Sequence, residues 1–428
     1  MISSSDFLIK ANHSLDSKNF ANKLALNIIM EDEMSEYINN NEKRVDQLFK
    51  FSKGILSGED GTKLMEQYGD ALKHITPHDM LAMEEKQLKS GISPHQIKEK
   101  IEKIMNVIYD HLKKYEWEKP NEDHALYYLM LENRELEKVL SKIKESLQDR
   151  DYVIVTEQVE ELFIMEHHYV RKENILFPFL EKIWKNCRPL SVMWSIHDDI
   201  RMKLKELRKV LAVNDEFNAD IFKLLGEVFF LMYGMIFKEE LVIYPVAMET
   251  LTVIDWRKIH AQSYDVGFSY ITPPTKGNIV STEPKESLAD LTRIFFQTET
   301  GSLSQQQLEL VLNTIPLDLT FIDENDEVKY FSSPKNRFFP RSPAIIGRKV
   351  HKCHPPESVH IVEKILDAFK TGTKKEASFH IQMKGKFINI RYFAVRDENE
   401  KYLGTLEASQ DVTEIRKMDG EKRLLDWE

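Results

Sequence analysis

HHYVRKENILFPFLEK, residues 167–182, decides the fold, because a second stretch of the chain repeats its pattern. The second stretch is YGMIFKEELVIYPVAME, residues 233–249. Each stretch holds a Lys-Glu pair, an apolar run, an aromatic residue and a proline, and the prolines Pro178 and Pro245 are 67 residues apart. Two helices with one pattern predict a pseudo-symmetric helical bundle. Histidines and glutamates that face the axis of such a bundle indicate a metal site.

Length and composition bound the class of protein. A chain of 428 residues is too long for one ordinary core, so we expect two or three domains. The net charge of −11 argues against a nucleic-acid binder held by phosphate contacts. Cys187 and Cys353 form no CxxC motif, which excludes a disulfide framework and a thiolate zinc site and fits a reducing cytoplasm. Without a signal-peptide pattern or a long apolar run, we expect a cytoplasmic protein with no membrane span.

Helical periodicity covers the first 256 residues. Residues 1–118 read as a small helical domain, in which Thr76-Pro77 and Ser93-Pro94 each begin a helix. Residues 119–256 then hold four long amphipathic segments with short connections, which predicts an up-down four-helix bundle. The four segments are expected at 123–147, 153–184, 190–212 and 217–250.

The period changes after the bundle. Residues 257–304 are rich in Pro, Gly, Ser and Thr, and we interpret them as a linker. Residues 305–418 predict two strands, short helices and then three strands, which is the order of a PAS domain. Residues 419–428 form a polar tail. The predicted fold is therefore multidomain, with an all-α N-terminal domain and bundle followed by an α+β PAS domain.

Each predicted bundle helix offers one candidate metal ligand. Side chains four apart share a helix face, so a His-x-x-x-Glu pair aims both groups at one point in a bundle core. Imidazole and carboxylate together suit iron or manganese. The candidates are His124, His168, His197 and Glu239.

These motifs resemble the hemerythrin-like (HHE) cation-binding family, which includes di-iron centre repair proteins. The resemblance rests on DHALYYLMLENRELE, HHYVRKENILFP, VMWSIHDDIR and KEELVIYP. In that family the second and fourth helices each read His-x-x-x-Glu before a proline. The resemblance therefore implies that His168 and Glu239 are ligands from these helices, and that His124 and His197 are the ligands from the first and third.

Two positions depart from the family pattern. Lys172 stands where the second-helix glutamate would be, and Met235 stands where the fourth-helix histidine would be. A thioether is a poor ligand for non-haem iron, and a lysine ammonium repels a cation. Glu173 and Glu240, one residue further on, are reserve ligands, although neighbours on a helix are about 100° apart. Mononuclear iron, di-iron and a bundle without metal all remain open.

The resemblance extends over nearly the whole chain. ITPHDMLAMEEKQLKSGISPHQI, residues 75–97, resembles the N-terminal helical domain of domain-of-unknown-function family number 438, which precedes a hemerythrin-like bundle and a PAS domain. PAS domains hold a small molecule or cofactor against their sheet. His360 and His354 are candidate cofactor-binding residues, with haem as the alternative cofactor, and packing or capping is the competing role for both.

Three functions are consistent with this order of domains. The first is a cytoplasmic sensor, not an enzyme, in which iron in the bundle responds to dioxygen, nitric oxide or redox state and the PAS domain relays the signal to an unidentified partner. The second is a scaffold with a degenerate metal site and a ligand- or haem-binding PAS domain. The third is an iron-handling or iron-centre repair protein. PAS strand edges and flanking helices often pair, which leaves a homodimer open.

Overall fold

The computed structural model describes residues 42–184, 187–274, 295–335 and 337–421. The chain divides into two compact units. Unit 1 is Met1–Lys119 with Phe237–Thr250, and unit 2 is Pro120–Ile236 with Leu251–Glu428. Among the described residues, no helix combines the length and the apolar character that a membrane span needs.

Unit 1 is helical where it is described, as predicted, and the prediction for residues 1–41 lies outside the described residues. Both predicted helix starts carry a capping box, Thr76 with Asp79 and Ser93 with Gln96. Its N-terminal helices are α2 (Glu42–Ser57), α3 (Gly61–Lys73), α4 (Pro77–Lys89) and α5 (Pro94–Leu112), and its later segments are η3 (Glu239–Ile243) and α12 (Tyr244–Thr250).

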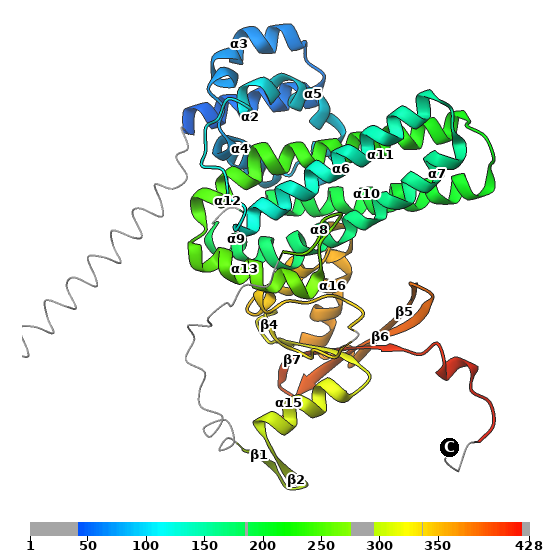
Figure 1. Ribbon diagram of the computed structural model, residues 1–428. Coiled ribbons are helices and arrows are strands. Elements are labelled where there is room, and N and C mark those ends of the chain that lie inside the picture. Colours follow the sequence, from blue (N-terminus) through cyan, green and yellow to red (C-terminus); the bar gives the residue numbers. More distant parts are fainter. Residues whose placement is uncertain (1–41, 185–186, 275–294, 336, 422–428) are drawn as a thin grey trace, which may run out of the picture. The chain divides into compact units, whose positions relative to one another are not determined.

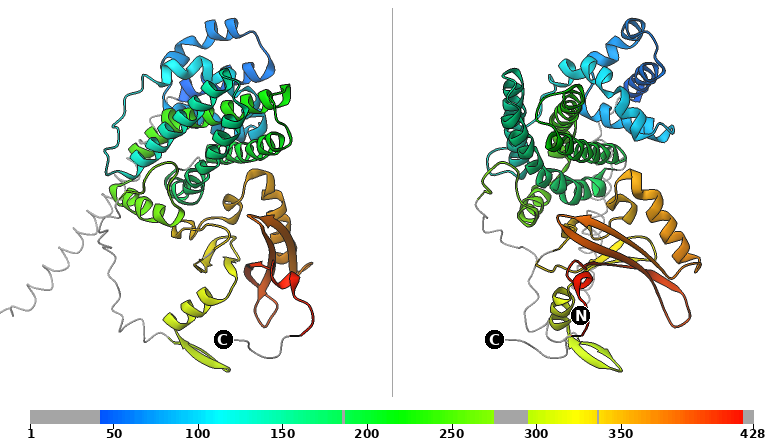
Figure 2. Two further views of the ribbon diagram at one scale, coloured as in Figure 1. Left: turned by 45° about the vertical axis from the view of Figure 1, so that its right-hand side comes forward. Right: turned by 90° about the vertical axis from the view of Figure 1, so that its right-hand side faces the viewer.

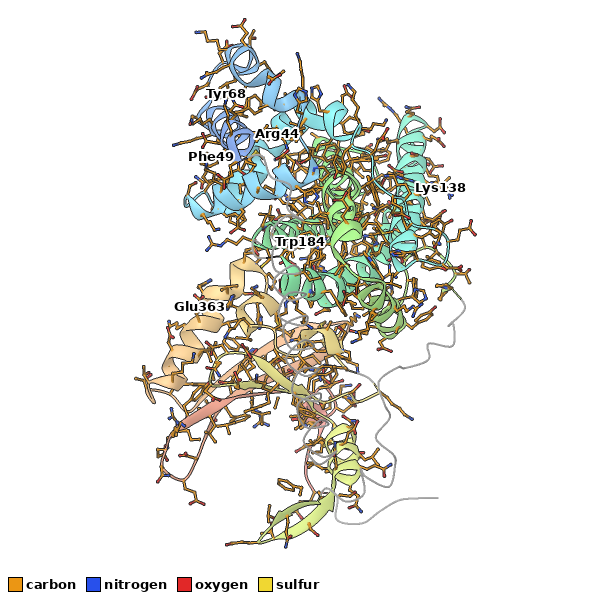
Figure 3. All side chains as sticks on the ribbon, turned by 90° about the vertical axis from the view of Figure 1, so that its left-hand side faces the viewer. Arg44, Phe49, Tyr68, Lys138, Trp184 and Glu363 are labelled. Atoms are coloured by element: carbon orange, nitrogen blue, oxygen red, sulfur yellow. The ribbon has the colours of Figure 1, made fainter. Side chains whose placement is uncertain are left out.

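Ion pairs to buried carboxylates link the helices of unit 1. Arg44, labelled in Figure 3, donates from Nε to Oδ2 of Asp79 at 2.7 Å. Nζ of Lys238 lies 2.8 Å from both carboxylate oxygens of Glu84, and the side chains of this pair are 2% and 3% exposed. The second Lys-Glu motif of the sequence therefore begins with a lysine that is fixed to α4.

Unit 2 begins with the predicted bundle, whose helices run alongside one another (Figure 1). Turns of other helix types interrupt its second segment, where η1 is a 3₁₀ turn and η2 is a π-helical turn. The elements are α6 (Ala125–Gln148), α7 (Tyr152–Glu161), η1 (Leu162–Met165), α8 (Glu166–Arg171), η2 (Lys172–Leu176), α9 (Phe177–Ile183), α10 (Pro189–Val213) and α11 (Ala219–Lys238), the last of which continues into unit 1.

Apolar stripes at helical spacing form the core of the bundle. On α6, Leu129, Leu136 and Leu140 are all at most 4% exposed. Glu132 lies within this same stripe and is fully buried. A buried carboxylate needs partners that offset its desolvation, so Glu132 marks a polar centre inside an otherwise apolar core.

The predicted linker over 257–304 needs correction at both ends. Helix α13 (Val253–Val266) runs past residue 256, because Thr252 and Asp255 form a capping box and Ile259 is buried. Gly267, with φ of +102°, ends it. Strands β1 (Phe295–Thr298) and β2 (Gly301–Ser304) pair as a hairpin. Residues 275–294 lie outside the described residues.

The C-terminal part of unit 2 is one antiparallel sheet of five strands in the order β4-β3-β7-β6-β5. Its two-plus-three strands and its helices are where the sequence predicts them. They are α15 (Gln305–Thr314), β3 (Asp318–Asp323), β4 (Val328–Phe331), η4 (Pro343–Ile345), η5 (Val350–Cys353), α16 (Pro356–Lys370), β5 (Glu376–Met383), β6 (Lys386–Arg396), β7 (Tyr402–Asp411) and η6 (Ile415–Lys417).

Helix α16 lies beside this sheet (Figure 2). Leu366 of α16 packs with Ile322 of β3 and Val350 of η5 to form a buried apolar cluster. Of the polar tail, residues 422–428 lie outside the described residues.

Candidate metal centre

The second bundle segment places two of the predicted site residues on consecutive turns. His168 lies on α8, and Glu173 lies in the π-helical turn η2 that follows it. Both side chains are buried, at 0% and 4% exposure. Single π-helical turns inside α-helices occur frequently at functional sites.

His168 is held by a carboxylate from α6. Its Nδ1 lies 2.7 Å from Oε2 of Glu132. The Nη2 atom of Arg171 also donates to Glu132, and the backbone N–H of Ser269 donates to Oε1 of Glu132 at 2.6 Å. Burial raises the pKa of Glu132 to about 7, against the effect of Arg171. These contacts mean that Glu132 orients the imidazole of His168, while Arg171 and the backbone of Ser269 hold Glu132 in place.

His197 of α10 has a matching partner. Its Nδ1 lies 2.7 Å from Oε1 of Glu173, and Nη1 and Nη2 of Arg201 donate to Oε1 and Oε2 of Glu173 at 2.9 and 3.0 Å. The ring of His197 stacks on that of Tyr169, with centroids 4.5 Å apart. Its Nε2 is buried and has no hydrogen-bond partner among the described residues.

Burial keeps both imidazoles neutral. It lowers the pKa of His168 and of His197 well below the usual value, and the nearby Lys172 adds to the effect on each. Metal ligation requires an unprotonated imidazole nitrogen. In His197, Nδ1–H donates to a carboxylate and Nε2 has no hydrogen-bond partner among the described residues, so Nε2 of His197 is the nitrogen that is available for a metal ion.

Lys172 is fully buried within this cluster. Burial lowers the pKa of its amine well below the usual value, with Arg201 adding to the effect and Glu173 opposing it. The amine is therefore driven toward its neutral form. A neutral amine does not repel a cation as an ammonium does, which weakens one objection to a metal that the sequence raises.

Two family models match the chain over the parts just described. Residues 124–247 match the hemerythrin HHE cation binding domain, and residues 308–413 match the PAS domain. The chain carries a hemerythrin HHE domain and a PAS domain. No curated protein matches it.

Several solved structures are similar to part of the chain. A C-terminal domain from Streptococcus mutans is 31% identical, covers 30% of this chain and 99% of its own, and has a TM-score of 0.29. A PAS domain from Colwellia psychrerythraea is 18% identical over 26% of this chain and 97% of its own, with a TM-score of 0.21. A sensory box sensor histidine kinase from Vibrio cholerae is 13% identical, covers 26% of this chain and 91% of its own, and has a TM-score of 0.20.

The donors of the hemerythrin domain fit an ion held by imidazoles better than a full di-iron centre. For the ion, two neutral histidines each have a carboxylate on Nδ1, and Nε2 of His197 is buried and unpaired. Against the di-iron centre, Lys172 and Met235 stand at two ligand positions. Within the described ranges, no group of three or more His, Cys, Asp or Glu side chains is arranged to hold a metal.

The structure gives His124 a capping role, and its role as a ligand stays a prediction. It is the N-cap of α6, where its Nδ1 accepts a hydrogen bond from the backbone N–H of Leu126 at 3.2 Å. Its ring packs against Trp256, with centroids 4.8 Å apart. With Nδ1 accepting, the neutral ring carries its proton on Nε2.

The two predicted glutamates of the fourth helix belong to unit 1. Glu239 is buried in η3, and the hydroxyl of Tyr244 donates to its Oε2 at 2.7 Å. Glu240 follows it in η3 and is half-buried. Their role as ligands stays a prediction.

The two candidate histidines of the PAS domain differ in exposure. His360 is exposed on α16, which does not suit the axial ligand of an enclosed haem. His354 is half-buried, and burial, helped by Arg341 and Arg348, lowers its pKa to about 4. Because this environment disfavours the imidazolium of His354, it is compatible with a packing role, which the sequence analysis gives as the alternative to cofactor binding.

Sequence reasoning missed Glu132 and Arg201 as partners of this site. A signal for Glu132 was present, because it is an acidic residue inside the Leu129–Leu136–Leu140 stripe. Arg201 gave no comparable signal. Glu173 was predicted as a reserve ligand; in the structure its Oε1 lies 2.7 Å from Nδ1 of His197, and its role as a ligand stays a prediction.

Proposed function

We propose that this protein is a cytoplasmic sensor, not an enzyme, in which the hemerythrin domain binds iron and the PAS domain relays the signal. His197 would hold the ion through Nε2, with His168 as a second ligand. The observation that carries the proposal is the unpaired, buried Nε2 of His197, together with a second buried histidine, His168, whose Nδ1 is likewise held by a carboxylate. The signal would be dioxygen, nitric oxide or a change of redox state.

Iron, when bound, would supply the reactivity toward small oxidants and diatomic gases. The protein's own residues would orient the ligands and keep water away from them. Glu132 and Glu173 fix the tautomer and the orientation of the two rings, and Arg171 and Arg201 neutralise these carboxylates. The stacked ring of Tyr169, which is 2% exposed, helps to exclude water from His197.

Burial supports a sensor rather than an enzyme. His168, His197, Glu132 and Glu173 are all at most 4% exposed, so a substrate larger than a diatomic molecule would have to displace packed side chains. The chain joins a hemerythrin HHE cation binding domain to a PAS domain. The proposal therefore includes a signalling partner that receives the signal from the PAS domain, and a homodimer.

The test is the absorption spectrum of Fe(II)-loaded protein before and after nitric oxide or oxygen is added. The expected result is a spectral change in the wild type that disappears in His197→Ala and persists in His167→Ala. His167 is the matched control because it is exposed and adjacent to His168. An equal response in His197→Ala would refute the site. If the wild type retains no iron, the scaffold alternative takes its place.

A further inference from the structure

The π-helical turn η2 and Pro178 leave two backbone carbonyls without helical donors. In an α-helix the carbonyl of Glu173 would accept from the N–H of Phe177, but that N–H donates to Lys172 instead. The carbonyl of Asn174 would accept from residue 178, which is a proline and has no N–H. Buried carbonyls of this kind require partners from elsewhere.

The PAS region supplies both partners. Nη1 of Arg348 donates to the carbonyl of Glu173 at 3.1 Å, and Oγ of Ser342 donates to the carbonyl of Asn174 at 2.6 Å. Arg348 is 6% exposed and Ser342 is fully buried. Arg348 is itself anchored by a two-point ion pair with Glu181 of α9, at 2.8 and 2.7 Å.

Glu173 therefore forms hydrogen bonds through both its side chain and its backbone. Its carboxylate holds Nδ1 of His197, while its carbonyl is held by Arg348. A second link joins the helix of His197 to the PAS domain, because Oγ of Ser195 donates to Oε1 of Glu357 at 2.6 Å. The direct path from the ring of His197 to the PAS domain therefore runs through the carboxylate and the carbonyl of Glu173.

We propose that Arg348 is a positioning residue for the His197–Glu173 pair and that η2 couples the histidine centre to the PAS domain. This inference deepens the proposed function by naming the connection that would relay the signal. The turn has two possible registers, because the N–H of Phe177 can donate to Lys172 or to Glu173. The bond from Arg348 favours the π register by satisfying the carbonyl that this register leaves free. A two-register element that both sites bias is the physical requirement for coupling.

The test uses the metal-free full chain, so that a failure to bind iron cannot decide it. The probe is the ¹⁵N resonances of the histidine rings in protein labelled selectively at histidine. Arg348→Ala should shift the resonances of His197 and leave those of His168, whose carboxylate partner comes from α6, unchanged. Lys352→Ala is the control, since Lys352 donates to Sγ of Cys187 and, among the described residues, forms no hydrogen bond with η2.

Ser342→Ala provides a milder second variant, because it removes only the hydroxyl that donates to Asn174. It should move His197 in the same direction as Arg348→Ala. The inference is overturned if both folded variants leave the His197 resonances at their wild-type positions, or if Lys352→Ala moves them equally. If Arg348→Ala does not fold, the Ser342→Ala spectrum alone decides between these results.

Discussion

Glu173 holds His197 in a buried pair, with Oε1 of Glu173 2.7 Å from Nδ1 of His197. The same carboxylate neutralises Arg201 through two further hydrogen bonds. This one relationship sets the tautomer of His197 and aims its Nε2 away from the carboxylate. This pair and three other titratable groups, Lys172, His354 and Lys238, carry the expected outcomes that follow.

Glu173→Gln should weaken both stability and iron binding. The amide leaves Arg201 without its main carboxylate, and breaking a buried ion pair costs about 3–5 kcal/mol. Loss of such a partner of a ligand histidine lowers metal affinity about 10–100-fold. Urea unfolding of the metal-free protein and titration with Fe(II) measure the two effects. Glu166→Gln is the matched control, because Glu166 pairs with the same Arg201 at the surface and should cost less than about 1 kcal/mol.

Lys172→Glu should restore the carboxylate that the hemerythrin pattern places on this turn. Without metal the variant should be less stable than the wild type, because a buried carboxylate replaces an amine that burial neutralises. Fe(II) should then stabilise the variant more than the wild type, and iron per chain should rise. Lys182→Glu, at an exposed position of α9, should change neither quantity. Equal stabilisation by Fe(II) in wild type and Lys172→Glu would contradict this view of the turn.

His354 should make the PAS domain sensitive to acid. Its folded pKa of about 4 lies below the ordinary value of 6.5, so the unfolded chain binds the proton first as pH falls. Its contribution is intact above pH 6.5 and is lost between pH 6.5 and 4, by up to about 3 kcal/mol. Denaturation followed by circular dichroism of the sheet, compared with His354→Gln, isolates the effect. A difference between the two proteins that does not change with pH would rule it out.

Glu84→Gln should destabilise unit 1. Lys238 is 2% exposed, and without Glu84 its ammonium would be buried unpaired, at a cost of about 3–5 kcal/mol. Thermal unfolding measures the loss. Asp46→Asn removes a partner of Lys86 at the surface and should matter far less. Similar losses in the two variants would show that Lys238 finds another partner.

The regular elements could be predicted from the sequence because local rules define them. Thr76 and Ser93 begin helices through capping boxes, and the change from helical to strand period locates the sheet near Asp318. Helix α13 was missed because Gly267 and the residues after it read as a linker, whereas the cap at Thr252 begins a helix before them.

The pairings of the site could not be predicted in the same way. Pro178 is visible in the sequence, but nothing local shows that Ser342 and Arg348 would take the freed carbonyls. These contacts join residues far apart in the chain. His124 is the predicted ligand of the first bundle helix, and in the structure it is the N-cap of α6. Spacing alone does not reveal this capping role.

The most direct measurement is the iron content of protein purified without oxygen and without an affinity tag, by elemental analysis, for wild type, His168→Ala, His197→Ala and His167→Ala. We expect iron in the wild type and in His167→Ala, and loss of iron in the other two variants. A wild type that holds no iron after Fe(II) loading, or a His197→Ala variant that holds as much as the wild type, would contradict an iron site at these two histidines.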